Sequence, residues 1–141
     1  MLLFLKNLLF TVLIPGTVGV YLPLWLVGRR PPAAPEWAWL LSALLLLAGA
    51  SLYFWCLWNF AVTGRGTPAP IDPPKKLVVR GPHRYVRNPM YLGVLSVVFG
   101  WAVLFRSTEI LRYGAVVALM FHLVVLVIEE PSLRRLFGDE Y

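Results

Sequence analysis

The chain has 141 residues, of which 59% are hydrophobic and 14% are charged, and its mean hydropathy is +0.71. This composition excludes intrinsic disorder and an ordinary soluble domain, in which about half of the residues are apolar and about a quarter are charged. The net charge of +6 would suit a nucleic acid, but the basic residues are scattered and follow no nucleic-acid-binding motif. We therefore expect that the protein does not bind nucleic acid and that its basic residues contact membrane lipids.

Four long, nearly uncharged stretches divide the chain. They predict helices at about residues 3–28, 37–62, 88–105 and 110–129. A helix rises about 1.5 Å per residue, so about 20 apolar residues cross a hydrocarbon core of about 30 Å. The first two stretches are long enough, and the last two become so if flanking arginines extend their charged ends to the membrane surface. We predict an all-α polytopic membrane protein, with four transmembrane helices in a single membrane domain over residues 1–141.

The segments between and after these helices are short. Glycines and prolines open the loop at residues 63–87 and exclude a long helix there. Residues 131–138 place apolar side chains on one helical face and Arg134 and Arg135 on another. That pattern predicts a short C-terminal interfacial helix, which lies on the membrane surface and is separate from the fourth span.

The distribution of basic residues predicts the orientation. Four crossings place both termini and the loop at 63–87 on one side of the membrane. That side carries Lys6, Arg65, Lys75, Lys76, Arg80, Arg84, Arg87, Arg134 and Arg135. The other side carries Arg29, Arg30, Arg106 and Arg112. Because basic residues gather in cytoplasmic loops, we predict a multi-pass protein whose termini and active site face the cytoplasm.

The start of the third predicted helix has the features of an anion site. Asn88 is a favourable N-cap and Pro89 a favourable first helical residue, so free backbone N–H groups and the positive end of the helix dipole should face the cytoplasm. Arg84 and Arg87 add positive charge, and Tyr91 lies one turn from Arg87. This pattern favours a bound anion. An ordinary membrane helix flanked by interfacial arginines is the other interpretation.

Glu129 and Glu130 form a second feature, at the predicted end of the fourth helix. Carboxylates there oppose the helix dipole and are costly to bury, so a bound cation would explain them. Alternatively they are solvated, or favour the helix that starts at Pro131. His122 lies seven residues before Glu129 on the same helical face, and we expect it to be a polar packing residue inside the bundle.

Other kinds of chemistry have no support in the sequence. His122 has no second metal ligand at a usable spacing, so we predict no metal site. Cys56 is the single cysteine, can form no disulfide within the chain, and is expected to pack in the second helix. An anion-binding helix start, aromatic rings and a carboxylate together suit a ligand with a carboxylate at one end, a cation in the middle, and an amine or diol.

Two segments are similar to those of a known family. The first is LVVRGPHRYVRNPMYLG at residues 77–93, and the second begins with Glu129 and Glu130 and ends with FGDEY at residues 137–141. These motifs resemble the integral-membrane methyltransferases typified by isoprenylcysteine carboxyl methyltransferase and the phospholipid methyltransferases. The resemblance covers roughly residues 75–141. It implies S-adenosyl-L-methionine as methyl donor, bound at the cytoplasmic end of the last helical hairpin, and a lipophilic methyl acceptor that arrives from the bilayer.

The resemblance also assigns residues to the cofactor. The backbone of Lys76, Leu77 and Val78 would line the cofactor cleft, residues 88–91 would hold the methionine part, and Glu129 would hold the amine or the ribose. The full set of cofactor-binding residues that it implies is Lys75, Lys76, Leu77, Val78, His83, Arg87, Asn88, Pro89, Met90, Tyr91 and Glu129.

The acceptor stays open among a carboxylate, an amine and a thiol. Methyl transfer from a sulfonium is an in-line displacement that needs alignment more than acid or base help, and for an amine the candidate catalytic groups are Glu130 and His122. Two positions differ from the family pattern: Asn88 replaces the usual histidine, and Val125 stands where prenylcysteine enzymes have an arginine. The alternative function is a non-catalytic four-helix scaffold or binding protein that retains the fold.

Overall fold

The computed structural model describes residues 1–64, 81–86 and 88–138, and in these residues all regular structure is helical. The helices are α1 (Leu2–Leu13), α2 (Leu22–Val27), α3 (Glu36–Asn59), α4 (Pro89–Phe105), α5 (Thr108–Val124) and α6 (Glu130–Phe137). Three π-helical turns, Thr17–Tyr21, Phe60–Gly64 and Val125–Glu129, join or extend them, and a 3-10 helix, Gly81–Arg84, precedes α4. The all-α prediction is confirmed.

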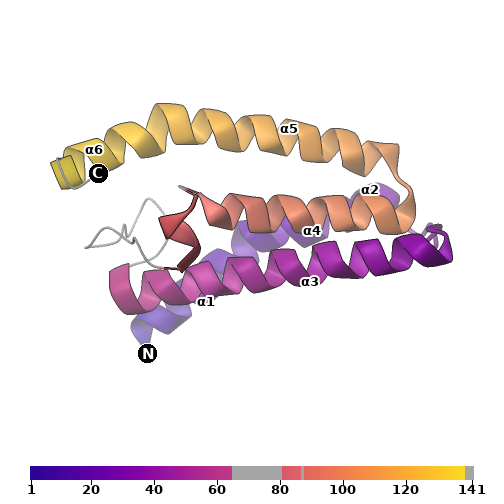
Figure 1. Cartoon of the computed structure of the whole chain (residues 1–141), viewed down its shortest axis with the longest axis horizontal. Helices are drawn as coiled ribbons and strands as arrows, with labels where there is room; N and C mark the ends of the chain where they lie inside the picture. The colour runs from indigo at the N-terminus through magenta and orange to yellow at the C-terminus, as the bar shows by residue number, and fades with distance from the viewer. Residues whose placement is uncertain (65–80, 87, 139–141) are drawn as a thin grey trace.

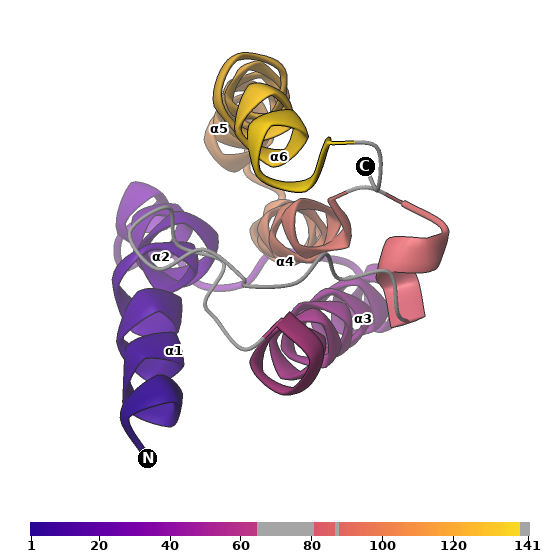
Figure 2. The same ribbon diagram turned by 90° about the vertical axis from the view of Figure 1, so that its left-hand side faces the viewer.

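The helices form an elongated bundle with α4 at its centre. Figure 2 looks along the bundle and shows α5 and α6 on one side of α4, α3 on another, and α1 and α2 on a third. Three helical stretches of the described residues are long and apolar enough to cross a membrane: Leu2–Val27, Glu36–Thr63 and Thr108–Phe137. α4 is apolar but shorter. These are the lengths and composition of an integral membrane protein.

The elongated bundle has two ends. The α6 end is the end at which α3 finishes, α4 begins and α6 lies, on the left of Figure 1. The opposite end is the end at which α3 begins and the short turn from Phe105 to Thr108 joins α4 to α5.

α1 and α2 are joined by a widened turn because Pro23 has no N–H to donate to the carbonyl of Gly19, four residues earlier. The turn at Thr17–Tyr21 is π-helical, and the N–H of Leu22 donates to the first carbonyl of that turn, five residues back. The carbonyl of Val18 therefore also loses its α-helical donor. The two freed carbonyls need partners inside an apolar environment.

Side chains from α4 and α5 supply those partners. The hydroxyl of Tyr113 donates to the Val18 carbonyl at 2.6 Å, and the indole N–H of Trp101 donates to the Gly19 carbonyl at 3.0 Å. These two bonds tie the bent first helical stretch to both later helices. A proline that interrupts the backbone ladder thus becomes an attachment point between helices.

α5 continues into α6 without a break, whereas the sequence predicts a fourth helix at 110–129 and a separate helix at 131–138. Pro131 follows the π-helical turn at Val125–Glu129 by the same spacing as Pro23 follows the first one, and Glu130 N–H donates to the first carbonyl of the turn. The widened turn accommodates the proline, so the helix does not end there. The placement of α6 on a membrane surface stays a prediction.

Small residues let α3 and α4 pack with their backbones close together. A Cβ atom on Gly49 would lie 2.6 Å from the carbonyl oxygen of Gly93, and one on Gly93 would lie 2.8 Å from that of Gly49. Farther along, Ser42 Oγ donates to the carbonyl of Gly100 at 2.9 Å. Close approach and interhelical hydrogen bonds hold helices together where lipid removes the hydrophobic driving force.

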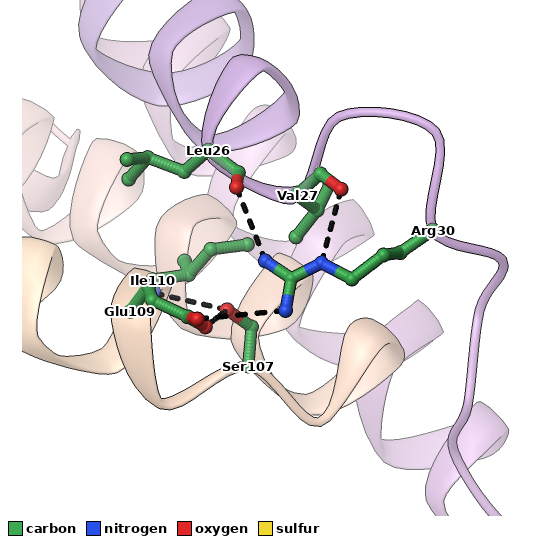
Figure 3. Close-up of polar contacts among 6 residues, drawn as sticks. All are labelled: Leu26, Val27, Arg30, Ser107, Glu109 and Ile110. Carbon is green, nitrogen blue, oxygen red and sulfur yellow. Dashed lines mark hydrogen bonds and ion pairs between the residues drawn. The ribbon is translucent and has the colours of Figure 1, made fainter.

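At the opposite end, Arg30 joins the first helical stretch to α5 (Figure 3). Its guanidinium donates to the carbonyls of Leu26 and Val27 at 3.1 Å each, and to Glu109 Oε1 at 3.5 Å. Ser107 Oγ donates to Glu109 Oε2 at 2.8 Å and accepts the backbone N–H three residues on, which caps the start of α5. The arginine satisfies the last carbonyls of α2 and fixes its end against α5.

The replacement Tyr113→Phe is expected to lower the free energy of unfolding by about 1 kcal/mol, because it leaves the Val18 carbonyl without a donor. In a Pro23→Ala background the loss should shrink, since an N–H at position 23 can donate to the Gly19 carbonyl, which lets the turn close as an α-helix in which the Leu22 N–H donates to the Val18 carbonyl. Unfolding of the four variants in mixed detergent micelles measures this cycle. An equal loss in both backgrounds would contradict the role given to Pro23.

Candidate functional site

The candidate site lies at the start of α4. Pro89 is the first helical residue and Asn88 the N-cap, as predicted, but the Asn88 side chain makes no capping hydrogen bond and its backbone angles are φ −129° and ψ 63°. The expected capping role of this side chain is therefore wrong in the structure. Because Pro89 carries no N–H, the N–H groups of Met90 and Tyr91 are the helical ones at this end without an intrahelical acceptor.

Tyr91 connects α4 to the last helical stretch in two ways. Its ring stacks on that of Phe121 from α5, with centroids 4.3 Å apart and planes inclined by 16°. Its hydroxyl donates a hydrogen bond to Oε1 of Glu129, which is the last residue of the π-helical turn. Both Tyr91 and Glu129 are half-buried. The two residues that the sequence singled out separately are therefore in direct contact.

The π-helical turn explains which side chains share the face of Glu129. Without the turn, residues seven apart would lie on one face of the helix. For that reason the sequence predicts that His122 shares a face with Glu129. A π-helical turn takes in about one extra residue, so Phe121, eight positions before Glu129, faces α4 instead. His122 is exposed, and its predicted packing inside the bundle is wrong.

Glu129 and Glu130 do not lie at a helix end, because the helical stretch runs on to Phe137. The two carboxylates therefore do not oppose the dipole of a helix C-terminus, as the sequence had suggested. For Glu129 the structure gives a different account: a hydroxyl group stabilises the half-buried carboxylate. Glu130 is also half-buried.

Other predicted site residues have packing roles in the structure. Met90 is 8% exposed and packs with Tyr53, Cys56 and Val94 in the apolar cluster between α3 and α4, and the Pro89 side chain is fully buried. Phe121 packs on the same cluster. Only the backbone N–H of Met90 therefore remains for a ligand. The prediction that Cys56 packs in a helix is confirmed, since it is fully buried.

Part of the predicted site lies outside the described residues. Lys75, Lys76, Leu77, Val78 and Arg87 belong to this part. The backbone of His83 is in the 3-10 helix before α4, which packs against α3. Arg84 in the same turn is exposed.

The described groups suit a zwitterionic ligand that carries a carboxylate and a cation. Free N–H groups at a helix start bind a carboxylate, and the dipole adds to that attraction. An ionised carboxylate accepts several hydrogen bonds, so Glu129 can bind an ammonium group or hydroxyls while Tyr91 donates to it. Aromatic rings attract cations. In the described ranges no group of three or more side chains could hold a metal ion.

Phe121 was missed by sequence reasoning. Its signal is the spacing of eight to Glu129, which has meaning only if Pro131 is first recognised as the cause of a π-helical turn. Nothing else distinguishes this phenylalanine from the other apolar residues of α5.

A comparison with protein families supplies independent information. The family model described as phospholipid methyltransferase matches residues 37–140. The matched range takes in almost all of α3 and everything after it, including the contact between Tyr91 and Glu129. No curated protein and no solved structure matches the chain.

The replacement Phe121→Ala is expected to destabilise the fold by about 1–3 kcal/mol, because it removes the ring that stacks on Tyr91 and packs on the α3–α4 cluster. Its neighbour provides the matched control: His122→Ala should change stability by less than about 0.5 kcal/mol. Thermal unfolding in detergent compares the two. Equal losses, or a larger loss for the histidine variant, would contradict the register described above.

Proposed function

This chain belongs to the phospholipid methyltransferase family, and we propose that it transfers a methyl group from S-adenosyl-L-methionine to a lipid at the α6 end of the bundle. The family implies methyltransferase activity. The observation that carries the more specific proposal is the contact between Tyr91 and Glu129 beside the free N–H groups of the α4 start.

The side chains present fit this cofactor. S-adenosyl-L-methionine carries a carboxylate, an ammonium group, a sulfonium and ribose hydroxyls. The N–H groups of Met90 and Tyr91 would bind the carboxylate, and Glu129 would accept from the ammonium or the ribose. The Tyr91 hydroxyl holds Glu129 in one orientation, so that less conformational entropy is lost on binding.

Catalysis in this proposal depends on alignment. When bound, the cofactor supplies an electrophilic methyl group on its sulfonium. The protein's part is to hold the donor by Glu129 and the α4 start while the acceptor approaches from the bilayer in line with the bond that breaks. An amine acceptor loses a proton as the new N–C bond forms, and Glu130 is the candidate proton acceptor. We favour Glu130 over the other candidate, His122, because His122 is exposed and lies on another helical face.

The acceptor proposed is a phospholipid with an amine headgroup. The family is described as phospholipid methyltransferases, which favours a phospholipid as the acceptor. In a phospholipid with an amine headgroup, the amine is the strongest nucleophile. Val125 agrees with this choice, because an apolar residue at that position offers no partner for the carboxylate of a prenylcysteine substrate. The isoprenylcysteine-type acceptor is therefore the less favoured one.

A four-crossing topology places this site correctly for such a substrate. α4 has 17 residues and is about 25 Å long, close to the hydrocarbon thickness of about 30 Å, and it packs against α3 through Gly49 and Gly93. We take it as the third of four crossings. Both termini and the loop at residues 63–87 then share one side of the membrane, and the excess of basic residues that the sequence has in these segments orients that side toward the cytoplasm.

The replacement Glu129→Gln is expected to weaken binding of S-adenosylhomocysteine at least tenfold, because it removes the charge that attracts the cofactor's ammonium group but keeps the size of the side chain. Glu36→Gln, at the opposite end of the bundle, is the control and should bind as wild type does. Isothermal calorimetry in detergent measures both. Equal affinities of the two variants would remove Glu129 from the cofactor site.

Transfer itself is tested with labelled S-adenosyl-L-methionine and vesicles that contain phosphatidylethanolamine. Label in the lipid fraction supports the proposal. Normal binding of S-adenosylhomocysteine with no label in any fraction of a whole lipid extract would instead favour the non-catalytic binding protein.

Single cysteines test the topology in a Cys56→Ser background. Ser132→Cys should react with a membrane-impermeant maleimide only from the cytoplasmic side, and Thr108→Cys only from the other side, as seen with sealed vesicles of both orientations. Both residues are exposed, so the readout does not depend on unfolding. Labelling of both cysteines from the same side would contradict the crossing of α5.

A further inference from the structure

A groove lies at the opposite end of the bundle, away from the proposed methyltransferase site. It has a volume of about 460 Å³, within the range of small-molecule sites of roughly 300–1,000 Å³. The start of α3, the end of α4 and the start of α5 form it, at the right of Figure 1. Its small buried residues are Ala38 and Ala102, and its exposed apolar residues are Trp37 and Leu111. This apolar lining suits an alkyl chain.

The edge of the groove is polar and positively charged. Arg106 and Thr108 line it, and both are exposed. The side chain of Arg106 makes no hydrogen bond or ion pair within the described part of the chain, whereas the side chain of Arg30 is engaged by Glu109. The guanidinium of Arg106 is thus available to an anion, and a planar guanidinium binds phosphate oxygens in a bidentate manner.

The backbone conformation of Arg106 is unusual for a residue with a side chain. It ends α4 in the left-handed conformation, with φ 47° and ψ 44°, and is the non-glycine residue with positive φ in the described residues. Glycine is the residue that fits this position without steric cost, so the arginine here carries a conformational penalty.

We propose that this groove binds one phospholipid of the adjoining leaflet, with its phosphate on Arg106 and one acyl chain over Ala38 and Ala102. In the proposed four-crossing topology, α3 begins and α4 ends at the membrane boundary, so Trp37 at the groove would lie there as an interfacial indole. Its charge is complementary to a phosphate and its interior to hydrocarbon. The site is distinct from the proposed acceptor site, since the two lie at opposite ends of α4.

Native mass spectrometry of the detergent-solubilised full chain tests the proposal with two lipids of the same acyl chains, phosphatidylglycerol and diacylglycerol. The first has the phosphate and the second lacks it. Wild-type protein should retain one phosphatidylglycerol at least threefold more than diacylglycerol. Arg106→Gln should reduce that retention to the diacylglycerol level, and Arg106→Lys should keep part of the preference.

Arg112→Gln is the matched control, because Arg112 is also an exposed arginine near this end but does not line the groove. It should retain phosphatidylglycerol as wild type does. Equal retention of both lipids by the wild type, or unchanged retention by Arg106→Gln, would overturn the site. Neither result bears on binding of S-adenosylhomocysteine, so failure of the groove and failure of the methyltransferase proposal are distinguishable.

Discussion

The fold depends on how two prolines without an N–H are accommodated inside long apolar helices. Each follows a π-helical turn by the same spacing, and each turn carries the helix onward where a break would leave backbone groups unpaired in lipid. At Pro23 the freed carbonyls take donors from Trp101 and Tyr113 and so bind three helical segments together. At Pro131 the turn sets the face that α5 presents to α4.

That second turn connects the fold to the proposed chemistry. It brings Phe121 and Glu129 to the same side, where Tyr91 stacks on one and donates to the other. The close backbone contact of α3 with α4 fixes the position of Tyr91 in the bundle, because its neighbours Met90 and Gly93 pack against α3. The carboxylate is thus held beside a helix start, an arrangement that suits the zwitterionic cofactor proposed above.

Much of this arrangement can be predicted from the sequence. Uncharged stretches indicate the helices, and the resemblance and the residue chemistry both single out Tyr91 and Glu129, which prove to be in contact. The roles of Phe121, His122 and the continuous α5–α6 stretch could not be predicted, because a proline is consistent with a helix end or with a widened turn, and packing against other helices decides between them. Local propensity also favours Asn88 as a cap, but its side chain makes no capping hydrogen bond in the structure.

The central claim is that the α4 start and Glu129 bind the cofactor together. Photochemical crosslinking with an azido derivative of S-adenosyl-L-methionine, followed by mass spectrometry of the peptides, tests it most directly. We expect label on the peptides that contain Met90 or Tyr91 and on those that contain Glu129, and we expect this label to be lost when unlabelled S-adenosylhomocysteine is in excess. Competed label confined to the opposite end of the bundle, around Trp37 or Arg106, would contradict it.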